Sequence, residues 1–348
     1  MKIGRSHVGP DHPPLVVAEL SANHNGMLER ALAVVDAVAG AGAHLLKLQT
    51  YTADTMTLDV DLPEFRIDTP GSLWEGRTLY DLYREGSTPW EWHEPIVERC
   101  REHGLDWFSS PFDVTAVEFL DRLDPAAYKI ASFEIVDLGL IRRVASTGKP
   151  VVMSTGMATL AEIDAAVRAA RDAGCADLVL LQCTSTYPAT PENSHLATIP
   201  HMAQAFGCPV GLSDHTLGIG VPLAAVGLGA ALIEKHVTLD RSGGGVDDAF
   251  SLEPDELRDL VQSSDRAWQA IGDVRYGPLT AERPSLQFRR SLYITRDLRA
   301  GDELTSDNLR AIRPGYGLPP RHLDELLGLR VARDVSRGTP ATWDLLAP

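Results

Sequence analysis

Histidines and carboxylates recur at the ends of apolar runs in this sequence. His215 follows the run PVGLSD, and Glu234 and His236 end the run ALIEKH. Two imidazoles that end adjacent strands could bind one divalent metal ion, with waters or a substrate at the remaining positions. A histidine pair alone leaves a structural role open, because buried, hydrogen-bonded histidines are common. The neighbouring Asp214 and Glu234 favour the metal site.

Lysines and serines follow the same pattern. Lys47 and Lys129 lie near the ends of the runs HLLKLQ and AAYKIA. A lysine there is more often a salt-bridged rim residue, and a serine more often caps the next helix. Two cations combined with hydroxyl donors and a Thr155-Gly156 turn instead suit a small molecule that carries a phosphate and a carboxylate. The serines in these positions are Ser110, Ser132, Ser154 and Ser213.

These polar residues end eight apolar runs, which alternate with amphipathic stretches over roughly the first 270 residues. This alternation predicts βα units. The number of apolar runs, eight, predicts an α/β fold of the (β/α)₈ TIM-barrel type. A doubly wound sheet is the alternative, but no Gly-rich fingerprint follows the first run. A barrel gathers the carboxyl ends of its strands on one rim, where chemistry occurs. The expected strands are 15–20, 44–49, 105–110, 126–131, 150–155, 177–183, 209–214 and 231–236, and expected helices include 27–42, 89–104, 160–174 and 253–272.

Two segments break this pattern. Residues 50–90 form a long, Pro- and Gly-containing connection, which in a compact domain is usually functional. After Gly272 a polar stretch leads into short β-like pieces. We therefore expect a catalytic barrel over 1–272, a linker over 273–285 and a small, mostly β domain over 286–348.

Composition excludes several classes of protein. The 348 residues are 44% hydrophobic and 23% charged, which is ordinary for a globular enzyme. The net charge of −16 argues against a nucleic-acid partner. No run approaches the roughly 20 apolar residues that span a bilayer, and the first residues lack a signal-peptide core, so no membrane role is expected. The four cysteines show no CxxC pairing, which predicts reduced thiols in the cytoplasm.

Motifs along nearly the whole chain resemble those of the sialic acid synthase family. They are long and occur in the family's order, so chance similarity is not a serious alternative. The matching segments are AELSANHNG (18–26), KLQTY (47–51), LYDLYREGSTPWEW (79–92), FSSPFD (108–113), YKIASFEI (128–135), STGMAT (154–159), GLSDHTLG (211–218), IEKHVTLDRSGGGVDDAFSLEP (233–254), RRSLYITRDLRAGD (289–302), RPGYGLPP (313–320) and TPATWDLL (339–346).

The resemblance implies a (β/α)₈ barrel followed by a small antifreeze-like (SAF) domain. It implies Mn²⁺ or Mg²⁺ on His215 and His236. It further implies that the substrates are phosphoenolpyruvate and an N-acylated amino sugar, and that the SAF domain covers the barrel of a partner in a domain-swapped homodimer. Phosphoenolpyruvate would be held by Lys47, Ser110, Lys129, Ser132, Ser154, Ser185 and Ser213, and the sugar by Glu19, Gln49, Tyr187, Asp247 and Arg313.

The resemblance and ordinary site chemistry together suggest a mechanism. The metal would polarise the aldehyde oxygen of the open-chain sugar, so that the enol carbon of phosphoenolpyruvate attacks it. Water would then add at the former enol carbon, and phosphate would leave by C–O cleavage. Glu234 is the candidate base for that water, with Asp247 or Glu134 as proton donor, and Lys47 and Lys129 neutralise the anions.

Within the family, the motifs resemble the pseudaminic acid synthase branch, whose acceptor is 2,4-diacetamido-2,4,6-trideoxy-altrose. Ser185 stands where N-acetylneuraminate synthases usually carry Asn, and Gln182 replaces an expected Lys or His. The alternatives are an N-acetylneuraminate or legionaminic acid synthase that uses a manno-configured sugar, another barrel aldolase or synthase, and a non-catalytic sugar-binding protein. A Schiff-base aldolase would need a desolvated lysine, for which Lys129 is the candidate.

Overall fold

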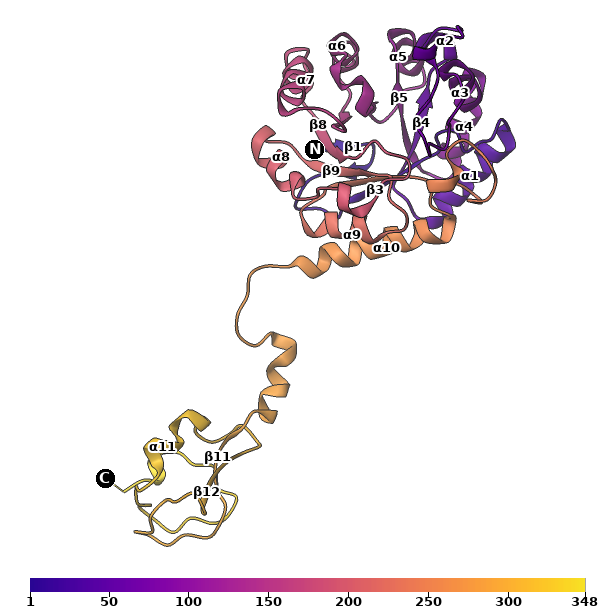
Figure 1. Cartoon of the computed structure of the whole chain (residues 1–348). Coiled ribbons are helices and arrows are strands. Elements are labelled where there is room, and N and C mark those ends of the chain that lie inside the picture. Colours follow the sequence, from indigo (N-terminus) through magenta and orange to yellow (C-terminus); the bar gives the residue numbers. More distant parts are fainter. Residues whose placement is uncertain (348) are drawn as a thin grey trace. The chain divides into compact units, whose positions relative to one another are not determined.

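Short runs rich in Val, Leu and Ile form eight parallel strands that close into a barrel (Figure 1). The computed structural model describes residues 1–347. Around the barrel the strand order is β10-β3-β4-β5-β6-β7-β8-β9. Each of the eight predicted runs contains one strand, so the predicted barrel is confirmed. The strands are β3 (Leu15–Glu19), β4 (Leu45–Thr50), β5 (Asp106–Pro111), β6 (Tyr128–Ile130), β7 (Val151–Ser154), β8 (Leu178–Cys183), β9 (Val210–Asp214) and β10 (Leu232–His236).

Helices connect successive strands on the outside of the barrel. Several begin at side-chain caps: Asp113 accepts backbone N–H bonds at the start of α5, and Thr159 forms a capping box with Glu162 at the start of α7. None of the helices within residues 1–347 is long and apolar enough to cross a membrane. The outer helices are α1 (Leu28–Ala41), α4 (Trp90–Glu102), α5 (Val114–Asp121), α6 (Leu138–Ala145), α7 (Leu160–Asp172), α8 (Thr198–Phe206), α9 (Gly220–Gly227) and α10 (Pro254–Ile271).

The strands separate two apolar layers, because successive side chains point to opposite faces. One cluster packs the outer face of the strands against the helices and includes Val16, Leu46 and Met153. A second, smaller cluster fills the barrel interior and includes Val17 and Leu45. This alternation determines which residues at the strand ends point into the barrel.

A short hairpin closes the amino end of the barrel. Its strands β1 (Lys2–Ile3) and β2 (Ser6–His7) are antiparallel, and Ile3 and Val8 belong to the interior cluster. The interior is therefore apolar at this end, and polar groups inside the barrel collect toward the carboxyl ends of the strands.

The long connection after β4 has its own structure. It contains α2 (Ala53–Met56), the 3₁₀ turn η1 (Pro63–Phe65) and α3 (Leu79–Gly86). Further 3₁₀ turns lie in other loops at the carboxyl end of the barrel: η2 (Ser132–Val136), η3 (Pro191–Asn193) and η4 (Asp248–Phe250).

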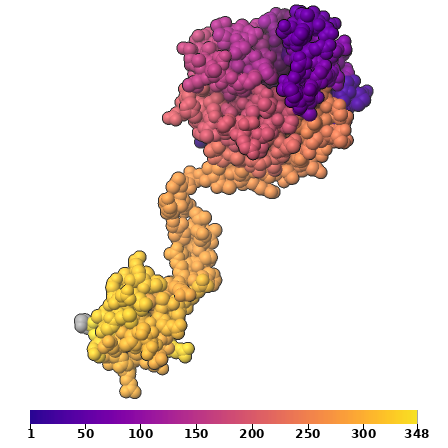
Figure 2. Space-filling view, viewed as in Figure 1, coloured from indigo at the N-terminus to yellow at the C-terminus, as the bar shows by residue number. Residues whose placement is uncertain are grey.

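The chain divides into two compact units, of which the first is Met1–Gly272 and the second begins at Asp273 (Figure 2). The second unit has its own apolar core, which includes Leu292, Leu309 and Leu326. Of the short β-like pieces expected after Gly272, residues 330–335 form only isolated bridges. The elements of this unit are η5 (Thr280–Phe288), the antiparallel pair β11 (Ser291–Ile294) and β12 (Leu309–Ile312), η6 (Pro320–His322), α11 (Leu323–Leu326) and η7 (Trp343–Leu345).

Candidate active site

Inward-facing positions change from apolar to polar toward the carboxyl ends of the strands. In β3, Val17 belongs to the interior cluster and Glu19 follows two residues later; Leu45 and Lys47 are related in the same way in β4. The same spacing places a polar group at the mouth from nearly every strand. These inward-facing groups are Glu19, Lys47, Gln49, Ser110, Lys129, Ser154, Ser213, Glu234 and His236.

A buried charge network lies at the centre of this group. Lys47 Nζ is 2.9 Å from Glu19 Oε2 and 2.8 Å from Glu234 Oε1, and Lys129 Nζ is 3.5 Å from the same Glu234 oxygen. These four side chains are only 1–3% exposed. Buried ion pairs contribute little net stability, because desolvation offsets their attraction. The network is therefore better explained by chemistry than by stability.

Hydroxyl and amide groups extend the network. Lys129 Nζ donates to Ser154 Oγ at 2.7 Å, and Ser213 Oγ donates to Glu234 Oε1 at 2.9 Å. Gln49 Nε2 donates to Glu19 Oε1 at 2.7 Å. Six strands thus hold one connected set of side chains in fixed orientations.

The two lysines differ in basicity. Burial lowers the pKa of Lys129, and the nearby Lys47 lowers it further. For Lys47, the adjacent Glu19 and Glu234 outweigh burial and raise its pKa. Burial alone would raise the pKa of Glu234, but Lys129 and Lys47 together lower it. At neutral pH Lys47 is therefore a fixed cation and Glu234 is a carboxylate.

A small polar niche adjoins the lysines. The Gly156 backbone N–H donates to Ser132 Oγ at 3.2 Å. A side chain at Gly156 would collide with the hydroxyls of both Ser132 and Ser185, so these three residues meet at one point. Ser110 Oγ is buried and has no hydrogen-bond partner among residues 1–347. Hydroxyl and backbone donors beside two lysines suit an anionic ligand.

The two predicted metal ligands face each other, with ring centroids 5.4 Å apart. His215 Nδ1 is 2.9 Å from the Thr184 carbonyl oxygen, so this nitrogen carries the proton and Nε2 keeps its lone pair. His236 Nε2 is 3.2 Å from Glu19 Oε2. Its Nδ1 is buried without a hydrogen-bond partner in the described chain.

The donor set at the mouth fits a divalent metal. Each imidazole has one nitrogen oriented by an oxygen acceptor and one available lone pair, the arrangement that metal-binding histidines adopt. Within residues 1–347 no group of three or more His, Cys, Asp or Glu side chains could hold a metal ion. Any metal on this pair would therefore take its remaining ligands from water or substrate.

Asp214 does not support this site, and its predicted contribution was wrong. Its side chain lies 2.9 Å from Lys235 Nζ and also accepts from Thr216 Oγ1. Successive side chains of a strand point to opposite faces. Asp214 follows the inward-facing Ser213, and Lys235 lies between the inward-facing Glu234 and His236. Both side chains of this ion pair therefore point away from the barrel interior.

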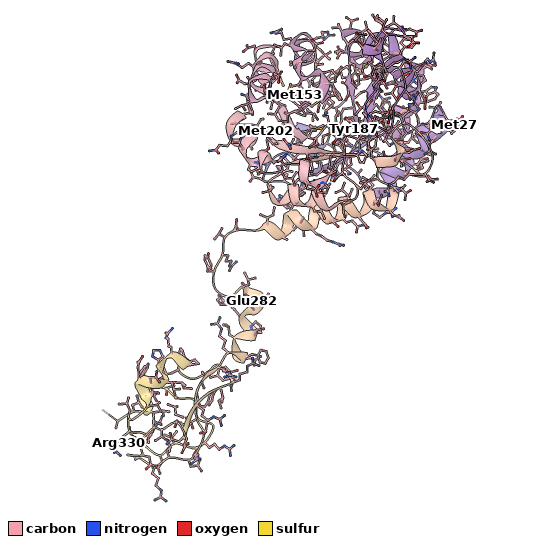
Figure 3. The ribbon with its side chains drawn as sticks, viewed as in Figure 1. Met27, Met153, Tyr187, Met202, Glu282 and Arg330 are labelled. Carbon is pink, nitrogen blue, oxygen red and sulfur yellow. The ribbon has the colours of Figure 1, made fainter. Side chains whose placement is uncertain are left out.

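Aromatic rings border the histidine side of the mouth. The Tyr187 ring centroid is 4.4 Å from that of His215 and 5.3 Å from that of Phe250. Figure 3 labels Tyr187 within the barrel unit. Trp74, from the long connection after β4, lies 5.6 Å from Tyr187. Trp74 was not predicted, although an aromatic residue in a long, irregular connection was the available signal.

Two predicted carboxylates lie on loops at the same end of the barrel. Asp247 Oδ2 accepts from Ser21 Oγ at 2.5 Å and is 3.7 Å from His236 Nδ1. Burial raises the pKa of Asp247, despite the nearby His236. Burial also raises the pKa of Glu134 to about 7, against the effect of Lys129. Ser21, which positions Asp247, was not among the predicted site residues.

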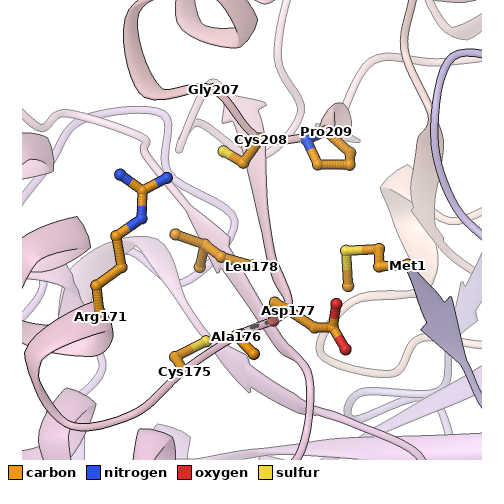
Figure 4. Close-up of a pocket in the computed structure, with 9 residues that line it drawn as sticks. All are labelled: Met1, Arg171, Cys175, Ala176, Asp177, Leu178, Gly207, Cys208 and Pro209. Atoms are coloured by element: carbon orange, nitrogen blue, oxygen red, sulfur yellow. Dashed lines mark hydrogen bonds between the residues drawn. The ribbon is translucent and has the colours of Figure 1, made fainter.

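Arg313 directly follows β12 and belongs to the second unit. Its predicted part in sugar binding stays a prediction. At the amino end of the barrel, a cavity of about 160 Å³ is lined by Met1 and by residues at or just before the starts of β8 and β9 (Figure 4). The predicted site residues lie at the carboxyl end, so this cavity is not part of the site. Its lining residues include Arg171, Cys175 and Cys208.

Known proteins resemble the chain over nearly its whole length. The NeuB family model matches residues 34–276, and the SAF domain model matches residues 289–347. The pseudaminic acid synthase of Campylobacter jejuni serotype O:2 is 42% identical over 97% of both chains. That of Helicobacter pylori is 41% identical over 95% of this chain and 97% of its own. The structure of an N-acetylneuraminic acid synthetase from Leptospira borgpetersenii, 30% identical, superposes with a TM-score of 0.73 over 83% of this chain and 95% of its own.

Proposed function

The chain belongs to the NeuB family, and from that premise we propose that it is a pseudaminic acid synthase. It condenses phosphoenolpyruvate with 2,4-diacetamido-2,4,6-trideoxy-altrose, adds water and releases phosphate to give a nine-carbon sugar acid. Residues 1–272 are the catalytic domain. Three findings support this proposal: the family to which the chain belongs, its similarity to pseudaminic acid synthases, and one observation at the barrel mouth.

That observation is a set of buried polar atoms without hydrogen-bond partners in the described structure. They are Ser110 Oγ, Glu134 Oε2, Glu234 Oε2 and His236 Nδ1. A buried polar atom without a partner costs about 1–3 kcal/mol, so several of them at one barrel mouth indicate a ligand site. An anion-binding donor, two carboxylates and an imidazole match a reaction between an anion and a polar sugar.

Phosphoenolpyruvate suits the lysine side of the mouth. Lys47 and Lys129 would neutralise its phosphate and carboxylate, and the niche of Ser132, Ser185 and Gly156 offers short, directed donors. These groups are held before the substrate arrives, so little reorganisation is needed on binding.

The sugar suits the opposite side, where the predicted residues Glu19, Gln49, Tyr187 and Asp247 surround the two histidines. His215 and His236 would hold Mn²⁺ or Mg²⁺. When bound, this metal would supply Lewis-acid polarisation of the sugar's aldehyde oxygen. Glu19 orients the His236 ring through Nε2, whereas Nδ1 has no hydrogen-bond partner in the described chain and would be free to bind the metal.

Glu234 is the proposed base for the attacking water. Its Oε1 is bound by Lys47 and Ser213, whereas Oε2 has no partner within the described chain and is available to a water. Its lowered pKa keeps it ionised and able to accept a proton. The water oxygen adds at the former enol carbon, and the C–O bond to phosphate then breaks.

A direct assay tests this proposal. The purified protein is incubated with phosphoenolpyruvate and Mn²⁺, and with either the diacetamido altrose or N-acetylmannosamine, with EDTA as a control. We expect EDTA-sensitive phosphate release with the altrose. Release with N-acetylmannosamine alone would assign the protein to the neuraminate branch, and sugar binding without release would make it a non-catalytic binding protein.

Glu134 is the proposed proton donor to the new hydroxyl, and this predicts a pH dependence. Its raised pKa of about 7 keeps it partly protonated at neutral pH, and the proton is lost as the pH rises through 7. We expect kcat to fall above about pH 7 in the wild type. A Glu134→Gln variant should be slower and should lose this alkaline limb. The measurement is kcat as a function of pH for the wild type and the variant. If the variant kept the same fall in kcat at alkaline pH, that fall would belong to a group other than Glu134.

We further propose a homodimer in which the SAF domain of each chain covers the barrel mouth of its partner and contributes Arg313. Large apolar side chains are exposed on loops at this mouth, among them Phe133 (58%), Met157 (64%) and Leu217 (61%). Exposed large apolar side chains on several loops of one rim support a protein interface there. Light scattering should give twice the mass of one chain, and the mass of a single chain at all concentrations would contradict the dimer.

We also place the protein in the cytoplasm. Its four cysteines are all free, and three of them are buried. Free thiols are usual in a reducing compartment.

A further inference from the structure

Trp74 lies on a segment that is ordered mainly by its own hydrogen bonds. The Ile67 N–H donates to the Arg77 carbonyl at 2.9 Å, and the Gly76 N–H donates to the Ile67 carbonyl at 2.8 Å. These bonds form a hairpin-like turn with Trp74 near its tip. The adjacent Leu73 is 47% exposed, so the apolar residues of this tip are not all packed against the barrel.

Trp74 connects this tip to the barrel mouth. Its indole Nε1–H donates to the Val246 carbonyl at 3.0 Å, and Val246 directly precedes Asp247. Its ring lies 5.6 Å from Tyr187 and is tilted by 48°. Trp74 therefore extends a row of rings that continues through Tyr187 to Phe250 and His215.

The chemistry of this row is apolar. The indole N–H is the only polar group of the Trp74 side chain and is already bound to Val246, so Trp74 offers a ligand only carbon surface. Such a surface packs well against methyl groups and C–H faces, and it offers sugar hydroxyls no hydrogen-bond partner.

We propose that Trp74 is a specificity-determining residue whose ring, together with that of Tyr187, selects an acceptor sugar with apolar substituents. This inference rests on the proposed function and deepens it. At carbon 6 the diacetamido trideoxy sugar carries a methyl group where N-acetylmannosamine carries a hydroxymethyl group, and at carbon 4 it carries an acetamido group in place of a hydroxyl. The rings of Trp74 and Tyr187 would pack favourably against the methyl groups at these two positions. N-acetylmannosamine has hydroxyl groups there instead.

The test compares three variants with the wild type. Trp74→Ala removes the ring, Trp74→Phe keeps a ring without the N–H, and Leu73→Ala is the matched control on the same tip. We measure kcat and KM for both sugars and for phosphoenolpyruvate. In Trp74→Ala, kcat/KM for the diacetamido sugar should fall about 10- to 100-fold relative to that for N-acetylmannosamine, mainly through the sugar KM.

Trp74→Phe should keep most of the preference, Leu73→Ala all of it, and the KM for phosphoenolpyruvate should stay within about 3-fold. An equal loss for both sugars, or no change in Trp74→Ala, would overturn the inference. If the wild type turned over neither sugar, the proposed function would fail. Calorimetric titration of each sugar into wild type and Trp74→Ala would then still test the role of the Trp74 ring. The difference in affinity between the two sugars should be smaller in the variant than in the wild type.

Discussion

Replacement of Glu234 by Gln should lower kcat at least about 100-fold, the usual scale for loss of a general base. The substitution keeps the shape of the side chain but removes the carboxylate that accepts the proton of the attacking water. It also leaves Lys47 without one of its two buried carboxylate partners. Phosphate release at saturating substrates measures the effect, and binding of phosphoenolpyruvate is measured separately.

A matched control separates catalysis from stability. Asp214→Asn breaks another buried ion pair, that with Lys235, on the outward face of the same strand pair. It should lower the Tm, because breaking one partner of a buried pair typically costs about 3–5 kcal/mol. Its kcat should stay within about 3-fold of the wild type. A Glu234→Gln variant that turns over as fast as Asp214→Asn would show that Glu234 is not the base.

Replacement of His236 by Ala should weaken Mn²⁺ binding at least about 100-fold and abolish phosphate release. The substitution removes one of the two nitrogen donors and leaves Glu19 and Asp247 without the imidazole between them. Titration calorimetry with Mn²⁺ measures the affinity without any turnover. In the wild type, EDTA should stop the reaction and excess Mn²⁺ should restore it.

His93→Ala is the control for this change. His93 is also a fully buried histidine, but it bonds Thr50 Oγ1 at 2.8 Å among residues on the outer face of the barrel. Its loss should lower stability and leave the Mn²⁺ affinity unchanged. Mn²⁺ binding of equal strength in wild type and His236→Ala would exclude this histidine as a ligand.

The barrel could be predicted because its strands are continuous apolar runs that end in polar residues. Several helices were harder to predict. α9 is almost wholly apolar, so it lacks the amphipathic periodicity that identifies a helix, and α5 and α6 are only 8 residues long. Local pattern therefore identified the strands and the longer helices.

The position of the inward-facing polar residues at one rim could also be predicted, because parallel strands bring their carboxyl ends together there. Strict alternation along β9 would also have excluded Asp214, since it lies between the inward-facing Ser213 and His215. Trp74 and Ser21 could not be found in this way. Their partners Val246 and Asp247 lie 172 and 226 residues away along the chain, and no local pattern indicates such contacts.

The most direct test of the proposed mechanism uses phosphoenolpyruvate labelled with oxygen-18 in the oxygen that bridges carbon and phosphorus. The labelled substrate is turned over with the diacetamido altrose and Mn²⁺, and the phosphate and the sugar acid are analysed by mass spectrometry. The proposed mechanism predicts labelled phosphate and an unlabelled nine-carbon acid, because water adds at carbon and the C–O bond breaks. Unlabelled phosphate, or phosphate without the nine-carbon acid, would contradict it.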